Sequence, residues 1–120
     1  MITVVNIRHL PGYPRVHLKP WEVYIGRRNT YAGLPGSPLA NPFPEWKYGR
    51  EGCIALFREQ LERSMESPER TPTLVAMRRE MQRLAGILAE HGRLALVCWC
   101  APLACHGDVI KACLDSMQGS

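Results

Sequence analysis

The run Leu94–Trp99 constrains the fold most, because its six residues are all apolar. Gly92 precedes it and Pro102 follows it, so the run has the length of a strand. A strand with apolar side chains on both faces has to be covered on both faces, which is typical of strands in parallel sheets. We therefore expect Leu94–Trp99 to be a buried strand of a parallel sheet.

Two shorter apolar runs near the start of the chain also predict strands. Met1–Ile7 is rich in β-branched residues, and Val23–Ile25 ends at Gly26. Between the second and third strands the apolar residues return every three or four positions, as they do on one face of a helix. This spacing predicts one helix over about Gly49–Met65, ended by Ser67-Pro68, and a second from Thr71-Pro72 to Gly92. A terminal helix repeats the pattern at Ile110, Cys113, Leu114 and Met117.

This order of elements predicts a single α/β domain over residues 1–120. We expect a short, mainly parallel sheet of about three to four strands flanked by three helices, with a Rossmann-like topology. The helix pair would be the crossover that joins Val23–Ile25 to a parallel strand at Leu94–Cys98. The loops after these two strands would then leave from the same edge of the sheet, where open α/β sheets bind ligands.

Composition places the chain among small proteins of the cytoplasm. The 120 residues contain no run of 18 apolar residues, and the first residues lack the basic start and cleavage site of a signal peptide. We expect a cytoplasmic protein without membrane contact, in the host cytoplasm if a phage encodes it. The formal net charge is +4, and twelve of the fifteen basic residues are arginine, which suits planar contact with phosphate or carboxylate. Nucleic-acid binding is only weakly supported by so small a charge.

The segment Gly26–Pro44 is expected to be a long, stiff loop, since it holds three glycines and four prolines. Its aromatic and leucine side chains indicate that it packs. Arg27 is placed to hold a phosphate, and Asn41 and Phe43 to hold a base or sugar. Together with neighbouring segments the loop suggests a ligand-binding set made of Arg8, Tyr24, Gly26, Arg27, Ser37, Asn41, Phe43, Trp99, Cys100 and Gly107.

The segment Cys100–Asp108 follows the third strand and has two chemical interpretations. In one, the backbone N–H groups at a helix N-terminus hold an anion and lower the pKa of a thiol there, with Cys105, His106 and Asp108 as the catalytic group if turnover occurs. In the other, three thiols and an imidazole hold a zinc ion, the set being Cys98, Cys100, Cys105 and His106. Cys53 and Cys113 lie on apolar helix faces and are expected in the core.

Four segments together resemble one family of small domains found in phages and many microbes, which is known only as a domain of unknown function. They are Val4–Arg8, Val23–Arg27, Gly36–Phe43 and Cys98–Asp108, the last reading C-W-C-A-P-L-A-C-H-G-D. Ala40 and Ala104 stand where the family commonly has glycine and proline. The resemblance covers nearly the whole chain and implies a shared site without implying an activity.

We therefore expect this chain to bind, and in one version to process, a small anionic, nucleotide-like ligand between the Gly26–Phe43 loop and the Cys100–Asp108 loop. The alternative is a zinc-stapled interaction module of a phage or bacterial protein that engages a host protein or nucleic acid. Both interpretations, the identity of any cofactor, the question of catalysis and the oligomeric state stay open at the level of the sequence.

Overall fold

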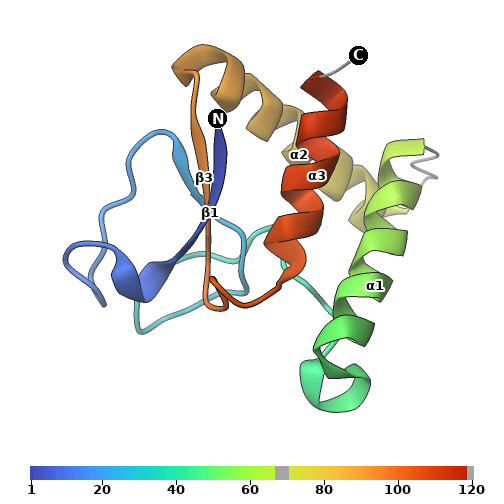
Figure 1. Cartoon of the computed structure of the whole chain (residues 1–120), viewed down its shortest axis with the longest axis horizontal. Coiled ribbons are helices and arrows are strands. Elements are labelled where there is room, and N and C mark those ends of the chain that lie inside the picture. The colour runs from blue at the N-terminus through green and yellow to red at the C-terminus, as the bar shows by residue number, and fades with distance from the viewer. Residues whose placement is uncertain (67–70, 119–120) are drawn as a thin grey trace.

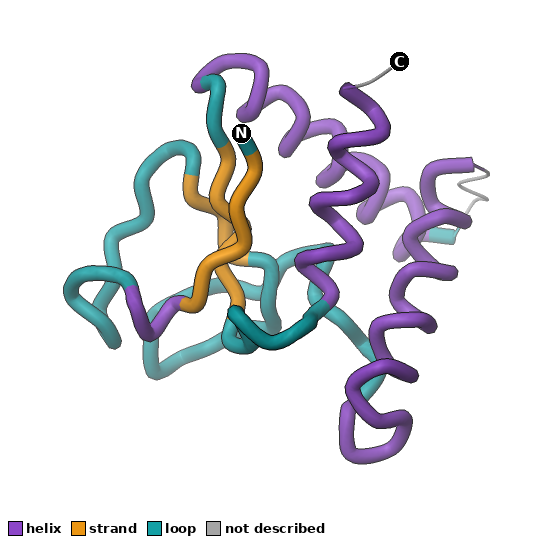
Figure 2. Tube along the Cα trace, viewed as in Figure 1, coloured by secondary structure: helices purple, strands orange, loops and turns teal. Residues whose placement is uncertain are grey.

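The computed structural model describes residues 1–66 and 71–118. Within these residues, three strands, one 3-10 turn and three helices follow one another (Figures 1 and 2). In chain order these are β1 (Ile2–Asn6), the 3-10 turn η1 (Ile7–His9), β2 (Glu22–Tyr24), α1 (Glu45–Glu66), α2 (Pro72–His91), β3 (Leu94–Cys98) and α3 (His106–Gln118).

The sheet is parallel throughout, with β3 between β1 and β2. Ile2 lies opposite Leu94, and Val23 lies opposite Leu96. All five residues of β3 are buried, as its uninterrupted apolar run predicts. The expected α/β domain with a short parallel sheet and three helices is confirmed.

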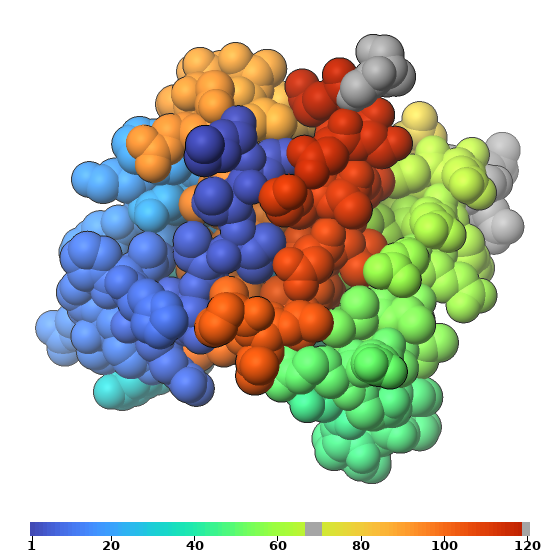
Figure 3. Space-filling view, viewed as in Figure 1, coloured from blue at the N-terminus to red at the C-terminus, as the bar shows by residue number. Residues whose placement is uncertain are grey.

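Two different layers cover the sheet, because side chains alternate along β3. Leu96 and Cys98 belong to the larger core, which they share with residues of all three helices. Val97 points the other way and packs in a smaller core with Ile7, Tyr24 and Leu34. Figures 1 and 2 show the helices together on one side of the sheet and irregular chain on the other. Figure 3 shows β1 at the surface between α3 and the segment that follows β1.

Local signals explain where the helices begin and end. Gly92 ends α2 in the left-handed conformation, with a φ of 69°, and its N–H bonds to the carbonyl of Leu88. Gly49 has φ 73° and ψ 166° and separates the turn Glu45–Tyr48 from the rest of α1. The predicted start at Gly49 therefore marks the regular part of this helix. The Ser67-Pro68 stop lies outside the described residues.

The leucine side chains of the loop Gly26–Pro44 pack into the core, whereas one of its aromatic rings does not. Leu39 is fully buried and Leu34 nearly so, whereas Tyr31 is exposed. A backbone hydrogen bond of 3.0 Å from Ser37 to Gly26 folds the loop back on its own beginning. Within the described ranges, no helix is long and apolar enough to cross a membrane.

Candidate ligand-binding site

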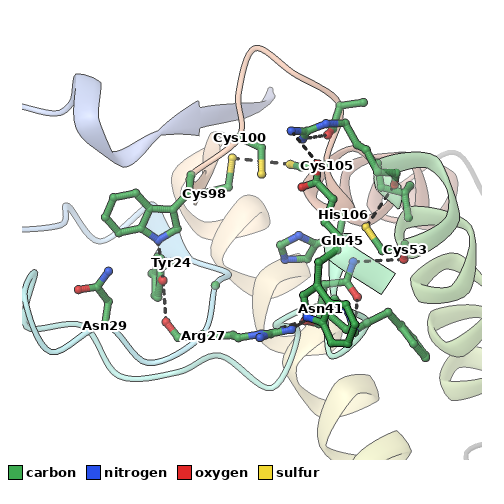
Figure 4. A pocket seen from close by; sticks show the side chains of 18 of the residues that line it. Tyr24, Arg27, Asn29, Asn41, Glu45, Cys53, Cys98, Cys100, Cys105 and His106 are labelled. Carbon is green, nitrogen blue, oxygen red and sulfur yellow. Dashed lines mark hydrogen bonds and ion pairs between the residues drawn. The ribbon is translucent and has the colours of Figure 1, made fainter. Parts of the chain in front are cut away.

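A cavity of about 460 Å³ opens at the carboxyl ends of β2 and β3. Three segments far apart in sequence form its wall: the loop after β2, the first turns of α1, and the loop between β3 and α3 (Figure 4). The topology produces this arrangement, because neighbouring parallel strands end at the same edge of the sheet. The residues lining it are Tyr24, Gly26, Arg27, Arg28, Asn29, Asn41, Phe43, Pro44, Glu45, Trp46, Arg50, Cys53, Ile54, Cys98, Trp99, Cys100, Ala104, Cys105 and His106.

Tyr24 and Gly26 shape the wall at the end of β2. The Tyr24 hydroxyl donates to the carbonyl of Arg27 at 2.6 Å and accepts from Nε1 of Trp99 at 2.9 Å. A Cβ on Gly26 would lie 2.5 Å from that hydroxyl oxygen, so the folded-back tyrosine needs glycine here. Both residues therefore act on the shape of the cavity, and the tyrosine hydroxyl already has its two partners.

Asn41 fastens the loop to α1. Its Nδ2 donates to the carbonyl of Cys53 at 3.2 Å, and its Oδ1 accepts from the N–H of Phe43 at 2.9 Å. Arg27 reaches across the loop and donates from Nε and Nη2 to the Asn41 carbonyl at 3.2 and 3.0 Å. Asn41 thus positions the loop through Oδ1 and one N–H of Nδ2, and it also lines the cavity, so its predicted role in ligand binding stays a prediction.

Asn6, at the end of β1, holds the loop between β3 and α3 in place. Its Nδ2 donates to the carbonyls of Trp99 at 3.0 Å and Ala101 at 2.9 Å, and its Oδ1 accepts from the N–H of Arg8 at 2.9 Å. The side chain is buried, so these bonds replace the water that it loses on folding. Asn6 thereby fixes the backbone on both sides of Cys100.

Cys98 and Cys105 form a buried pair in the wall of the cavity, with their sulfurs 3.6 Å apart. The Cys105 thiol donates to the Cys98 sulfur, which also accepts from the N–H of Ala101 at 3.4 Å. The hydrogen bond from Cys105 lowers the pKa of Cys98 to about 6. The same bond, together with burial, raises the pKa of Cys105. The lowered pKa expected for Cys105 at the helix N-terminus thus falls on Cys98, because Cys105 is the donor of the pair.

His106 begins α3 and faces the cavity with one ring edge bound to the protein. Its Nε2 lies 2.8 Å from the carbonyl oxygen of Ile25. A carbonyl oxygen only accepts, so Nε2 carries the proton and Nδ1 of the neutral ring is an acceptor. The ring of Phe57 meets the imidazole edge-on, with ring centroids 5.1 Å apart. Burial lowers the pKa of His106, which favours the neutral ring.

Positive charge dominates the rim of the cavity. Arg27, Arg28 and Arg50 line it, with Glu45 as the one lining carboxylate among the described residues. Arg50 donates from Nη1 to the carbonyl of Ala104 at 2.9 Å, and its Nη2 lies 3.4 Å from Glu45 Oε1. A hydrogen bond with the thiol of Cys100 raises the pKa of Arg50. This arginine therefore ties α1 to the loop that carries the cysteines.

The four residues of the zinc interpretation lie close together without forming a recognisable metal-binding group. Cys98, Cys100, Cys105 and His106 all line the cavity. In the part of the chain that the structure describes, no three His, Cys, Asp or Glu side chains are grouped so that they could hold a metal ion. His106 Nε2 is hydrogen-bonded to the carbonyl of Ile25, so only Nδ1 of this ring could bind a metal without breaking that bond.

Residues 6–116 match the model of a family described as a domain of unknown function, DUF4326. The chain belongs to the DUF4326 family. The expected family resemblance is confirmed, and three of its four segments, Val23–Arg27, Gly36–Phe43 and Cys98–Asp108, lie wholly inside the match. No curated protein and no solved structure matches the chain.

The DUF4326 domain brings most of the predicted site residues to one cavity. Four of them do not line it: Arg8, Ser37, Gly107 and Asp108. Arg8 lies over the ring of Trp99, and its Cζ is 5.5 Å from the ring centroid. The Ser37 hydroxyl accepts a hydrogen bond from the N–H of Leu39. The catalytic roles of Cys105, His106 and Asp108 stay predictions.

Gly107 and Asp108 act on the start of α3. A Cβ on Gly107 would lie 3.0 Å from side-chain carbons of Ile25 and Val4, so glycine lets the helix approach the sheet closely. Asp108 Oδ2 accepts from the N–H of Cys105 at 3.0 Å, and this closes the first turn of the helix. Neither residue needs a ligand to explain its place in this DUF4326 domain.

Sequence reasoning missed the contribution of α1 to the site. Glu45, Trp46, Arg50 and Ile54 line the cavity, and none of them was singled out as a site residue. Gly49 interrupts the helical pattern just there. That glycine, between a solvent-exposed tryptophan and an arginine, is the signal in the sequence that could have marked a turn bearing functional side chains.

Proposed function

We propose that this DUF4326 domain binds a small anionic, nucleotide-like ligand in the cavity between the Gly26–Phe43 loop and the Cys100–Asp108 loop. The observation that carries the proposal is the composition of one cavity. Three arginines against one glutamate line it, together with aromatic rings and backbone from both loops. Its volume of about 460 Å³ lies in the range of small-molecule sites.

The arginines supply the affinity for an anion. Arg27 and Arg28 are exposed at the rim, on the loop that leaves β2. The guanidinium of Arg28 has no hydrogen-bond or ion-pair partner among the described residues, so it can turn to a ligand without breaking a contact. A guanidinium offers paired donors to a phosphate, which suits a ligand of this class.

A thermal-shift screen with nucleoside monophosphates tests the proposal, with isothermal titration of AMP as the quantitative assay. A ligand that binds only the folded state stabilises it by about 2.7 kcal/mol at one hundred times its Kd. We expect AMP to raise the melting temperature and R27Q/R28Q to weaken AMP binding by about tenfold or more. R63Q is the matched control, because Arg63 is an exposed arginine in the last turn of α1 and does not line the cavity.

Two results would count against nucleotide binding. If no nucleotide raises the melting temperature, or if R63Q weakens binding as much as R27Q/R28Q does, the cavity is not the anion site. Elemental analysis of the same preparation addresses the zinc-stapled interaction module directly. Near-stoichiometric zinc without a nucleotide response would favour that alternative.

A further inference from the structure

Trp46 combines a place in the cavity wall with high exposure. It lines the cavity, yet 86% of its surface is accessible, more than for any other large apolar residue that the structure describes. An indole of this size is ordinarily buried for a large part of its area. Its exposure beside a charged cavity points to a contact that forms with a ligand.

The turn that carries Trp46 is held in place. The N–H groups of Lys47 and Tyr48 both donate to the carbonyl of Pro44 at 3.2 Å. Gly49 then takes a conformation, φ 73° and ψ 166°, that is essentially restricted to glycine. Beyond it Arg50 pairs with Glu45, which closes the turn from the other side. Trp46 is therefore presented by an ordered segment.

The other aromatic rings of the cavity already have partners. Phe43 meets Tyr48 edge-on, with ring centroids 6.0 Å apart. The ring of Trp99 meets that of Tyr13 edge-on, with centroids 5.9 Å apart, and lies under the guanidinium of Arg8. Tyr24 is buried and hydrogen-bonded at its hydroxyl. Over residues 1–66 and 71–118, Trp46 makes no ring or cation contact, so its faces are open to a flat ligand group.

We propose that Trp46 is the stacking platform for the base of the ligand, so that the domain selects nucleoside phosphates over sugar phosphates and inorganic phosphate. This inference rests on the proposed function and names the ligand class. The base lies on the indole face, while the phosphate meets the arginines of the rim. Stacking on an aromatic side chain tolerates any base, because every base has a π face.

Titrations of AMP and ribose 5-phosphate into the wild type, W46A and W46F test the inference. Wild type is expected to bind AMP more tightly than ribose 5-phosphate. W46A is expected to bind AMP about 5- to 140-fold more weakly, which is the range for loss of one base stack, and ribose 5-phosphate unchanged. W46F keeps an aromatic face and is expected to recover most of the AMP affinity. AMP should also quench the tryptophan emission of wild type and quench it much less in W46F.

Y31A is the matched control, because Tyr31 is 71% exposed and does not line the cavity. Equal binding of AMP by W46A and wild type would overturn the inference, and so would equal losses for AMP and ribose 5-phosphate in W46A. In the first case the arginine site, and with it the proposed function, stands. If neither compound binds wild type, the proposed function itself fails.

Discussion

Replacement of Asn6 tests how the cavity is held together. Asn6 makes three hydrogen bonds, two of them to carbonyls more than ninety residues further along the chain. Each bond contributes about 0.5–1.5 kcal/mol, so Asn6→Ala should lower the free energy of unfolding by about 2–4 kcal/mol. This is a large share of the roughly 5–15 kcal/mol that stabilises an ordinary domain. Urea unfolding followed by far-UV circular dichroism measures the change.

Asn6→Asp sharpens the test, because it keeps the acceptor for Arg8 and turns the donor into a second oxygen. That oxygen would face the carbonyls of Trp99 and Ala101, at the positions where Nδ2 now lies 3.0 and 2.9 Å away. Burial and these acceptors raise the pKa of the new carboxyl, so the folded state binds the proton more tightly. Stability of Asn6→Asp should therefore fall as pH rises from 4 to about 7.

The control is Asn29→Ala, which removes one side-chain hydrogen bond, from the N–H of Ala32 to Oδ1, at a half-buried position. Its expected cost is about 1 kcal/mol. If Asn6→Ala costs no more than Asn29→Ala, the two long-range bonds contribute nothing net and our account of this wall of the cavity is refuted.

Three further results are expected. Gly49→Ala forces a side chain into a glycine-only conformation, although open space surrounds its Cβ, and should cost about 1–3 kcal/mol in urea unfolding; a smaller loss would mean that the turn relaxes. Burial lowers the pKa of His106 in the folded protein, so as pH falls below 6.5 the unfolded protein takes up a proton at this residue before the folded protein does. The free energy of unfolding should therefore decrease below pH 6.5. A His106→Gln variant with the same pH profile as wild type would contradict this. Brief iodoacetamide treatment of the native protein, mapped by mass spectrometry, should label half-exposed Cys100 and Cys113 before buried Cys53, Cys98 and Cys105; early labelling of Cys105 would contradict the structure.

The elements with strong local signals were predictable from sequence. Pro72 at the start of α2 and Gly92 after its end flank a regular apolar face, so local sequence rules place this helix correctly. The uninterrupted apolar run of β3 likewise predicts burial on both faces of the strand. Parallel pairing followed from the helix pair between β2 and β3, since such a crossover returns the chain in the same direction.

What could not be predicted depends on contacts between distant segments. The role of Asn6 becomes visible only when β1 is laid beside β3. The hydrogen bond of Cys105 with Cys98, together with burial, raises the pKa of Cys105, whereas its place at a helix N-terminus predicts a lowered pKa. Trp46 was missed for a different reason: it lies before Gly49, where the predicted helix begins, so the turn that carries it fell outside that helix.

The position of β3 in the sheet also bears on how the chain acquires its structure. β1 and β2 do not pair with each other, and each has β3 as its partner. Asn6 and Trp99, which bond across the sheet, are separated by 93 residues. On the ribosome this parallel sheet cannot form until β3 has emerged, and contacts this far apart in sequence slow folding. Chains cut short before β3 would be expected to expose two unpaired strands and to be prone to aggregation or degradation.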